Sequence, residues 1–346
     1  MKKHNHLAFI LLALFIVGCG DSKKLFTIDI NQSKNQFSLN ETIKLKVKNS
    51  ENAKIDSVSY SIDSKKIGKS TSNNEFNFSL KNEKLGEQII IANVFYEGNK
   101  EIDSLNIEII SNIKPRSLKY TLVNTFKHDT SSFTEGFEFH KDTLYESTGE
   151  KGNSYFRKYN YKTGQVYSQK NLDAMYFGEG ITILNNKLYQ FTWQQKVGFV
   201  YNLKTLEKEK DFTFDSKIIE GWGATNDGTN IIQSDGTNKI WFLKSDDLSV
   251  INSISVYSGE TKIESLNEIE YVNGKLFANI WHKNAIAQIN PKNGAVEGIL
   301  DVSKLVKLVS NTSEERVLNG IAYNSKTQTF FIVGKNWDKM FEIKIE

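Results

Sequence analysis

The hydrophobic and polar positions of this chain alternate with the two-residue period of β-strands along most of its length. Clear examples are residues 43–47, 76–80 and 89–94, and short polar turns such as residues 72–74 separate such runs. Apolar side chains at every second position form the buried face of a sheet. The pattern therefore predicts an all-β protein.

A longer repeat is superimposed on this alternation in the last two-thirds of the chain. Each copy opens with an acid or amide, usually followed by glycine, and continues through a strand, a turn and a second strand. The openings are spaced by about 41 to 52 residues, and short strands repeating every 40–50 residues or so are typical of a β-propeller with one blade per repeat. The five openings are Glu135-Gly136, Glu179-Gly180, Glu220-Gly221, Asn267-Glu268 and Asn319-Gly320.

These patterns predict two folded units. Residues 118–346 are expected to form a five-bladed β-propeller, in which the early strand at residues 120–126 completes the last blade, closes the ring and removes two open sheet edges. Residues 25–111 contain about six or seven short strands, which favours an immunoglobulin-like β-sandwich. The sandwich carries no catalytic constellation and is interpreted as a spacer or docking module, with residues 112–117 as the linker.

The N-terminus has the features of a targeting segment. Lysines precede an apolar run at residues 7–17, which is too short to span a bilayer and is typical of a signal peptide covering residues 1–18. The run ends in Ile-Val-Gly-Cys19, which resembles a bacterial lipobox, although an ordinary signal peptide is the alternative. Lipidation of Cys19 would anchor the protein through a tether at residues 19–24. We expect a lipid-anchored protein of the bacterial cell envelope, facing the periplasm or on the outer membrane.

Composition narrows the possible chemistry. A net charge of +3, without a dense basic stripe, argues against a nucleic-acid partner, and a monomer is expected. The single cysteine allows no internal disulfide. The sequence has no zinc motif, phosphate-binding loop or Gly-x-Ser-x-Gly elbow, and its five histidines do not cluster. We therefore expect no metal, no cofactor and no serine or cysteine nucleophile.

Aromatic residues gather in the repeated phrases instead. A tryptophan N–H needs a hydrogen-bond partner, and its faces suit flat or cationic ligands. These aromatic residues either pack the blades or form a ligand cage at one end of the channel. Their convergence with Glu179, Asn267 and Lys335 would favour a cage, whereas Asp235 is interpreted as a turn or bracing residue. The tryptophans in the phrases are Trp193, Trp222, Trp281 and Trp337.

Eight short phrases occur in order over roughly residues 120–346. They are Phe133-Thr-Glu-Gly, Tyr176-Phe-Gly-Glu-Gly, Thr192-Trp, Gly221-Trp-Gly, Ser234-Asp-Gly-Thr, Asn267-Glu-Ile-Glu-Tyr, Ala278-Asn-Ile-Trp and Gly334-Lys-Asn-Trp. Together they resemble the plant-type glutaminyl-peptide cyclotransferases, which are five-bladed propellers also found in bacteria. This resemblance implies conversion of the N-terminal glutamine of a peptide or protein to pyroglutamate, with release of ammonia and without a catalytic zinc.

The resemblance also implies roles for individual residues. Glu179 matches the family's central acid/base, and Asn267 and Lys335 match the polar residues that hold and polarise the substrate. Glu135 stands where the plant enzymes carry glutamine, so it either binds the substrate ammonium or raises the pKa of Glu179. The matching aromatic cage consists of Phe133, Phe177, Trp193, Trp222 and Trp281.

The residue chemistry fits such a cyclisation. One carboxylate can take a proton from the α-amine and return it to the leaving ammonia if its pKa lies near the working pH. Burial among tryptophans raises a glutamate pKa, and Lys335 or Asn267 can stabilise charge on the amide oxygen. Two alternatives stay open: a non-catalytic propeller that binds peptide N-termini or cations, and a carbohydrate-cleaving enzyme using Glu135 and Glu179 as paired carboxylates.

Overall fold

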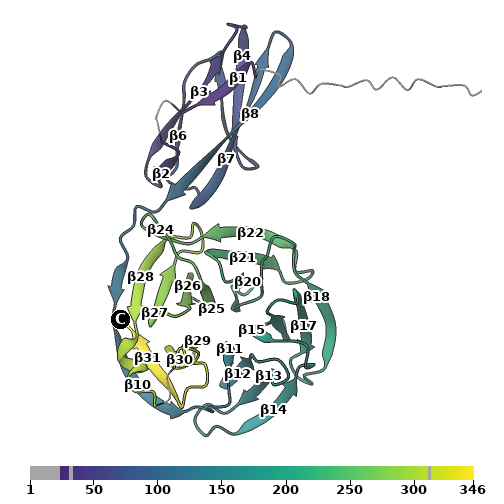
Figure 1. The fold of residues 1–346 in the computed structure, drawn as a ribbon, viewed down its shortest axis with the longest axis vertical. Helices are drawn as coiled ribbons and strands as arrows, with labels where there is room; N and C mark the ends of the chain where they lie inside the picture. Colours follow the sequence, from purple (N-terminus) through teal and green to yellow (C-terminus); the bar gives the residue numbers. More distant parts are fainter. Residues whose placement is uncertain (1–23, 31–33, 311–312) are drawn as a thin grey trace, which may run out of the picture.

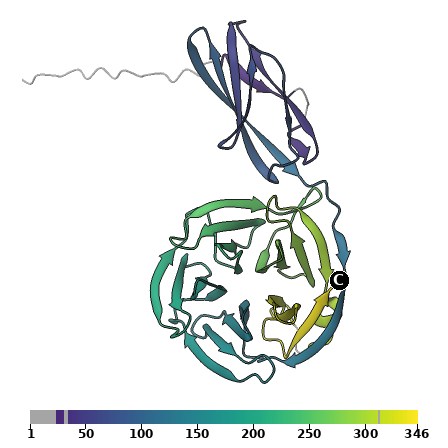
Figure 2. The same cartoon turned by 180° about the vertical axis from the view of Figure 1, so that it is seen from behind.

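The computed structural model describes residues 24–30, 34–310 and 313–346, which form two all-β units (Figures 1 and 2). Strands β1 to β8 make the N-terminal unit, and β9 to β31 make a ring of sheets. Within the described part of the chain, α1 (Ser303–Val306) is the one α-helix, and no helix is long and apolar enough to cross a bilayer. The predicted leader and Cys19 lie outside the described residues.

The N-terminal unit consists of two sheets that share one hydrophobic core. In β3 the residues Ile43, Leu45 and Val47 are buried while the lysines between them are exposed, as the alternation predicts. The unit has eight strands, more than the six or seven expected, because β1 and β2 are too short for alternation to identify them. The first sheet holds β1 (Phe26–Asp29), β3 (Thr42–Asn49) and β6 (Phe76–Ser79), and the second holds β2 (Gln36–Ser38), β8 (Asn99–Ile110), β7 (Gly86–Tyr96), β4 (Ile55–Ile62) and β5 (Lys65–Thr71).

The ring contains five sheets of successive antiparallel strands, arranged around a common centre (Figure 1). The first three are β11 (Thr134–His140), β12 (Thr143–Thr148), β13 (Tyr155–Tyr159) and β14 (Val166–Asn171); β15 (Gly178–Leu184), β16 (Lys187–Thr192), β17 (Val197–Asn202) and β18 (Lys208–Thr213); and β19 (Ala224–Asn226), β20 (Asn230–Ser234), β21 (Lys239–Lys244) and β22 (Val250–Ser255). The last two are β25 (Leu266–Val272), β26 (Lys275–Ile280), β27 (Ala285–Ile289) and β28 (Val296–Asp301); and β29 (Leu318–Asn324), β30 (Thr329–Gly334), β31 (Lys339–Ile345) and β10 (Tyr120–Lys127). A small hairpin of β23 (Tyr257–Ser258) and β24 (Thr261–Lys262) lies outside these sheets.

Burial falls from the centre of the ring outwards. The innermost strand β15 is buried along its whole length, whereas the outermost strands β14 and β18 are largely exposed. An inner strand is covered on both faces by neighbouring sheets. Its side chains are therefore apolar or hydrogen-bonded on both faces, and its sequence does not alternate between apolar and polar residues. Four of the five opening residues lie on such inner strands, and Glu220 lies in the loop before β19. The four are Glu135 on β11, Glu179 on β15, Asn267 on β25 and Asn319 on β29.

Strand β10, which precedes the first sheet in sequence, closes the last sheet of the ring. β10 pairs antiparallel with β31, from Tyr120 opposite Ile345 to Lys127 opposite Lys339, which is the pairing expected from the sequence. The end of the expected linker at residues 112–117 overlaps a short strand, β9 (Arg116–Leu118), which adds to β28 as a parallel edge strand. Gly298 permits this addition, since a Cβ there would lie 2.9 Å from the Leu118 side chain.

Side-chain hydrogen bonds join each inner strand to the next around the ring; we call these contacts the inner-strand bridges. They use buried polar groups of the channel, and burial raises the pKa of Glu270 to about 8. The inner-strand bridges are Ile183 N to Glu138 Oε1 (3.0 Å), Asn226 Nδ2 to Thr182 Oγ1 (2.8 Å), Thr225 Oγ1 to Glu270 Oε2 (3.1 Å), Ile321 N to Glu268 Oε2 (2.8 Å) and Asn319 Nδ2 to the Thr134 carbonyl (3.0 Å).

The N-terminal unit is attached to the ring by buried contacts. Tyr257 of the ring is fully buried within the hydrophobic core of the N-terminal unit, and its hydroxyl donates to Glu108 Oε1 at 2.8 Å. The backbone N–H of Leu85 donates to the Asn293 carbonyl at 3.0 Å. These contacts fix one side of the N-terminal unit against the β23–β24 hairpin and the fourth sheet.

The seam between the last sheet and the first gives a test of ring closure. Phe126 of β10 lies 5.4 Å from the Tyr161 ring and 5.9 Å from the Phe331 ring, measured between centroids. We predict that Phe126→Ala lowers the free energy of unfolding by about 2–3 kcal/mol in chemical denaturation, because it removes this contact. Leu122→Ala on the same strand, at a side chain 40% exposed, should cost less than about 1 kcal/mol. Equal effects of the two substitutions would contradict this account of closure.

Candidate active site

The opening residues of the repeats meet because the inner strands approach one another very closely. A Cβ built on Gly136 would lie 2.6 Å from the Ile181 nitrogen, and one on Gly180 would lie 2.5 Å from the Ala224 nitrogen. Only glycine tolerates such an approach of two backbones. The acid before each glycine is therefore carried to the same end of the ring as its counterpart in the next strand.

Glu135 is held in a buried ion pair. Lys335 Nζ lies 2.6 Å from Glu135 Oε1, and Asn319 Nδ2 donates to Glu135 Oε2 at 2.8 Å. The Lys335 ammonium also lies 4.6 Å from the centroid of the Phe133 ring, a cation–π contact. Burial raises the pKa of Glu135, and the neighbouring ammonium of Lys335 opposes this shift. Both oxygens of this carboxyl therefore have partners in the protein itself.

Glu179 is in a different situation, although it is equally buried. Its side chain is 4% exposed, and within the described part of the chain its Oε2 atom has no hydrogen-bond partner. Burial raises its pKa well above the usual value, the negative charges of Glu135 and Glu220 raise it further, and Lys335 lowers it. Burial therefore favours the protonated form of this carboxyl relative to an exposed glutamate, and its unpartnered oxygen can accept a hydrogen bond from a ligand.

The predicted cage residues form two groups of ring contacts, which together we call the aromatic belt. Phe133 and Phe177 are 6.1 Å apart between ring centroids, Phe177 and Trp193 are 5.4 Å apart, and Trp222 and Trp281 are 5.9 Å apart at 88°. Trp281 is 41% exposed, so this end of the belt is open to solvent. At one end of the belt Phe133 contacts the Lys335 ammonium, and at the other end Trp281 reaches the surface.

Glu220 joins the two halves of this belt, and the sequence interpretation missed it. Its Oε2 accepts the indole N–H of Trp193 at 2.6 Å and that of Trp222 at 2.8 Å. The signal was present in the sequence, because each tryptophan N–H needs an acceptor and Glu220 lies two residues before Trp222. Asn319 was also missed as a site residue, although it occupies the opening position of its repeat.

Asn267 lies in β25 with a second unpartnered acceptor. Its side chain is buried and its Oδ1 atom has no hydrogen-bond partner within the described part of the chain. Its own carbonyl accepts the Ser234 hydroxyl at 2.7 Å, which fixes the backbone there. Two buried acceptors without donors, Glu179 Oε2 and Asn267 Oδ1, suit a ligand that brings N–H groups.

Two other residues of the repeated phrases do not join this site. Trp337 is fully buried and donates its indole N–H to the Arg316 carbonyl at 2.9 Å, so it packs its sheet. Asp235 accepts the indole N–H of Trp241 at 2.8 Å and the Thr237 hydroxyl at 2.6 Å, which is the bracing role expected. Among the described residues, no group of three or more His, Cys, Asp and Glu side chains is placed to hold a metal ion.

The fold and the site define a ring-shaped all-β protein in which a buried carboxyl on an inner strand lies near a group of indoles whose outermost member, Trp281, is exposed. A sequence model of the family described as Glutamine cyclotransferase matches residues 93–345, so the chain belongs to this family. It is 39% identical over 228 residues, 65% of this chain and 71% of the relative, to a glutaminyl-peptide cyclotransferase of Arabidopsis thaliana.

A solved structure agrees with the sequence comparison. The chain is similar to the crystal structure of Myxococcus xanthus glutaminyl cyclase, with a TM-score of 0.62 and 29% sequence identity. The match covers 67% of this chain and 99% of that one.

The electrostatic coupling between the two glutamates can be measured in the isolated protein. We predict that Glu135→Gln moves the titration of the Glu179 carboxyl to lower pH, because it removes a negative charge and leaves the Lys335 ammonium without its counter-ion. Carbon-13 NMR of labelled glutamate side chains measures this titration, with the Glu179 signal assigned as the one lost in Glu179→Gln. The exposed pair member Glu209 supplies a control, since Glu209→Gln should leave the titration unchanged. An unchanged or raised midpoint in Glu135→Gln would contradict the coupling.

The role of Glu220 predicts a second outcome. Glu220→Ala leaves two indole N–H groups without their acceptor, so we expect a loss of about 1–3 kcal/mol in the free energy of unfolding and stronger quenching of tryptophan fluorescence by acrylamide. Glu220→Gln retains an acceptor oxygen and should remain close to the unsubstituted protein in both measurements. If Glu220→Ala leaves quenching unchanged, Glu220 does not hold the cage.

Proposed function

We propose that this protein is a glutaminyl-peptide cyclotransferase, which converts the N-terminal glutamine of a peptide or protein to pyroglutamate and releases ammonia. The observation that carries the proposal is the buried Glu179 carboxyl, with a raised pKa and an unpartnered oxygen beside the Glu135–Lys335 pair. Membership of the glutamine cyclotransferase family, and the relatives named above, supply the reaction.

In the proposed reaction the α-amino nitrogen attacks the carbonyl carbon of the glutamine side chain. A C–N bond closes a five-membered ring, the bond to the side-chain nitrogen breaks, and one proton moves from the attacking nitrogen to the departing one. Glu179 takes that proton and returns it to the leaving ammonia. Because its pKa is raised towards the working pH, neither transfer is strongly uphill.

Lys335 and Asn267 are proposed to hold and polarise the amide. Lys335 uses one of its three N–H donors on Glu135, and the ion pair fixes its ammonium at the inner end of the aromatic belt. Charge that develops on the amide oxygen would be stabilised there in a site of low dielectric. The unpartnered Asn267 Oδ1 is suited to accept an N–H of the substrate.

The ion pair favours one of the two roles considered for Glu135. Since both Glu135 oxygens have partners within the protein, we assign it the positioning of Lys335 and the elevation of the Glu179 pKa, and not direct binding of the substrate ammonium. The cage of Phe133, Phe177, Trp193, Trp222 and Trp281 would enclose the N-terminal residue, which restricts it to folded conformations that bring nitrogen and carbonyl together.

The organisation of the molecule is part of the proposal. We assign the ring to a five-bladed β-propeller, residues 118–346, and the N-terminal unit to an immunoglobulin-like sandwich, residues 25–111. Four-stranded sheets around one centre and two sheets on one core support these assignments. We further propose a monomer that is lipid-anchored in the bacterial cell envelope through Cys19, on the strength of the lipobox-like sequence.

The proposal is tested with the purified protein and a peptide that begins with glutamine. Mass spectrometry should show loss of one ammonia, and activity should survive strong zinc chelators. The same peptide with an acetylated N-terminus should remain unchanged, because it lacks the nucleophilic amine. No loss of ammonia from any glutamine-initiated peptide would refute the assignment.

The assignment of Glu179 has its own test. Glu179→Gln retains the size and much of the hydrogen bonding of the side chain but cannot transfer the proton, so kcat should fall at least about 100-fold. Thermal unfolding should stay near that of the unsubstituted protein, which separates a catalytic defect from misfolding. A variant with near-normal turnover would remove Glu179 from the acid/base role.

A further inference from the structure

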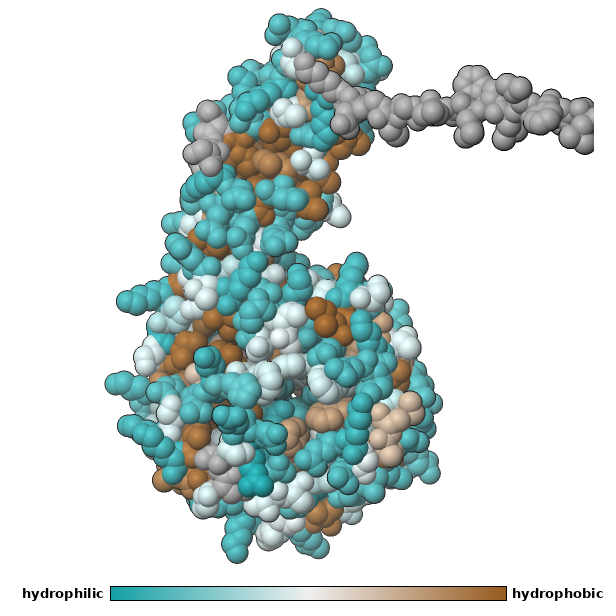
Figure 3. All heavy atoms as spheres, viewed as in Figure 1, coloured by the Kyte–Doolittle hydropathy of each residue, from teal (hydrophilic) through white to brown (hydrophobic). Residues whose placement is uncertain are grey.

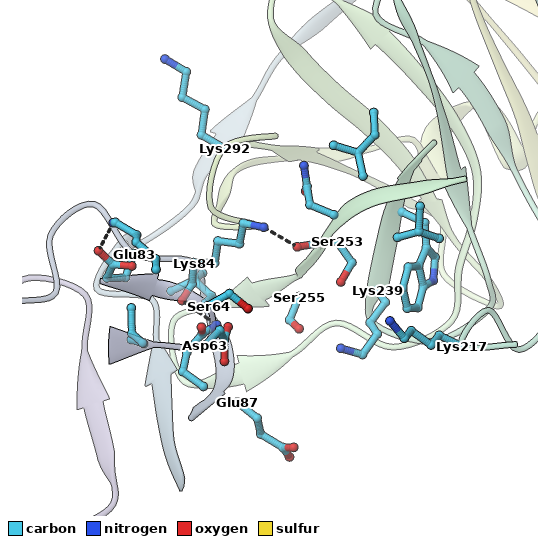
Figure 4. Close-up of a pocket in the computed structure, with 18 of the residues that line it drawn as sticks. Asp63, Ser64, Glu83, Lys84, Glu87, Lys217, Lys239, Ser253, Ser255 and Lys292 are labelled. Atoms are coloured by element: carbon cyan, nitrogen blue, oxygen red, sulfur yellow. Dashed lines mark hydrogen bonds and ion pairs between the residues drawn. The ribbon is translucent and has the colours of Figure 1, made fainter. Parts of the chain in front are cut away.

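A large hollow lies between the N-terminal unit and the third sheet of the ring. Its volume is about 1080 Å³, and the surface is visibly hollowed where the two units meet (Figures 3 and 4). One wall is built from the β4–β5 turn and the β6–β7 loop of the N-terminal unit. The other wall is built from the edge of β21 and β22 and from the loop before β19. We call this hollow the inter-unit groove.

The inter-unit groove and the aromatic cage share two loops of the ring. Lys217 lines the groove, and Glu220 of the same loop holds the two indoles of the cage. Three residues of extended chain span at most about 11 Å, so the two features are close neighbours. The second loop is the turn before Lys239, where a Cβ on Gly236 would lie 2.5 Å from the Trp222 ring.

Most charged groups of the inter-unit groove are already used within the protein. Lys65 pairs with Glu83 at 2.7 Å, and Lys84 Nζ donates to the Ser253 carbonyl at 3.1 Å, as the dashed lines in Figure 4 mark. Asp63 Oδ1 accepts the Ile89 N–H at 3.1 Å. Further acidic groups on the walls are Glu87, which lies 3.7 Å from Lys262 and is largely exposed, and Asp215, whose Oδ1 accepts the Lys217 backbone N–H at 2.9 Å.

Lys217 and Lys239 differ from these groups. Neither ammonium has a hydrogen bond or ion pair with another side chain of the described residues. Lys239 Nζ lies 6.0 Å from the centroid of the Trp241 ring. Both labelled side chains lie on the ring side of the groove in Figure 4, whereas Lys292 projects from its other end. Two ammonium groups without an ion pair among the described residues therefore line the groove, on loops that also reach the cage.

We propose that Lys217 and Lys239 bind acidic side chains of the substrate, a few residues beyond the N-terminal glutamine that the cage holds. The inference rests on the proposed function, and it names the preferred substrate class: polypeptides with Asp or Glu at roughly the fourth to sixth position, given about 3.3 Å of chain per residue. The N-terminal unit then has a direct role, because it forms the far wall that confines the downstream chain.

The test compares two glutamine-initiated peptides that differ at positions four to six, where one carries glutamate and the other the uncharged glutamine. At low salt the kcat/KM of the acidic peptide should be about 3- to 10-fold higher than that of the uncharged peptide. This factor corresponds to the binding free energy that two partly exposed ion pairs contribute. High salt should remove this difference. In the double variant Lys217→Ala/Lys239→Ala the difference should disappear, while a glutamine-initiated dipeptide, too short to reach the groove, should react as before.

Lys292→Ala is the matched control, because it removes one positive charge from the same groove but at its other end, and the preference should persist. Equal kcat/KM for the two peptides, or a preference that survives the double variant, would overturn the proposal. Fluorescence anisotropy with the same peptides separates this proposal from the proposed function. A protein that binds the acidic peptide more tightly through Lys217 and Lys239, but releases no ammonia, would support the groove and refute the cyclotransferase activity.

Discussion

The close packing of the inner strands is the constraint on which the rest of the structure depends. Backbones that approach as closely as those at Gly136 and Gly180 bring the preceding carboxyls within electrostatic reach of each other. The inner-strand bridges then fix the five sheets around the ring through buried side chains. The same geometry buries the glutamates of the inner strands, and burial raises the pKa of Glu179, Glu268 and Glu270.

The two glutamates of the site differ in whether their carboxyl oxygens have partners within the protein. Glu135 has Lys335 and Asn319 on its two oxygens, and both partners favour its charged form, whereas Glu179 has an oxygen without a partner and a pKa well above the usual range. Two carboxyls in one low-dielectric site thereby acquire different tasks, one electrostatic and one in proton transfer. The aromatic belt completes the site by fixing the substrate, and Glu220 holds its two central indoles.

Much of this was predictable from local signals. Alternation predicted the all-β class, and the repeat openings predicted that Glu135, Glu179, Asn267 and Asn319 lie at one end of the ring, whereas the role proposed for Glu179 came from the family resemblance. The short strands β1, β2 and β9 were not predictable, since three or four residues show no period and β9 exists only by pairing with β28. The partners of Glu135 were not predictable either, because Lys335 and Asn319 are about 200 residues away and only ring closure brings them near.

The central claim is that Glu179 transfers the proton at a raised pKa set by burial and by Glu135. The most direct measurement is kcat as a function of pH, with a saturating glutamine-initiated peptide so that the free amine of the substrate does not dominate. The account predicts an acidic limb with its midpoint well above 4.5, which coincides with the titration of the Glu179 carboxyl and is lost in Glu179→Gln. A limb at the ordinary glutamate value, or one that persists unchanged in Glu179→Gln, would contradict the account.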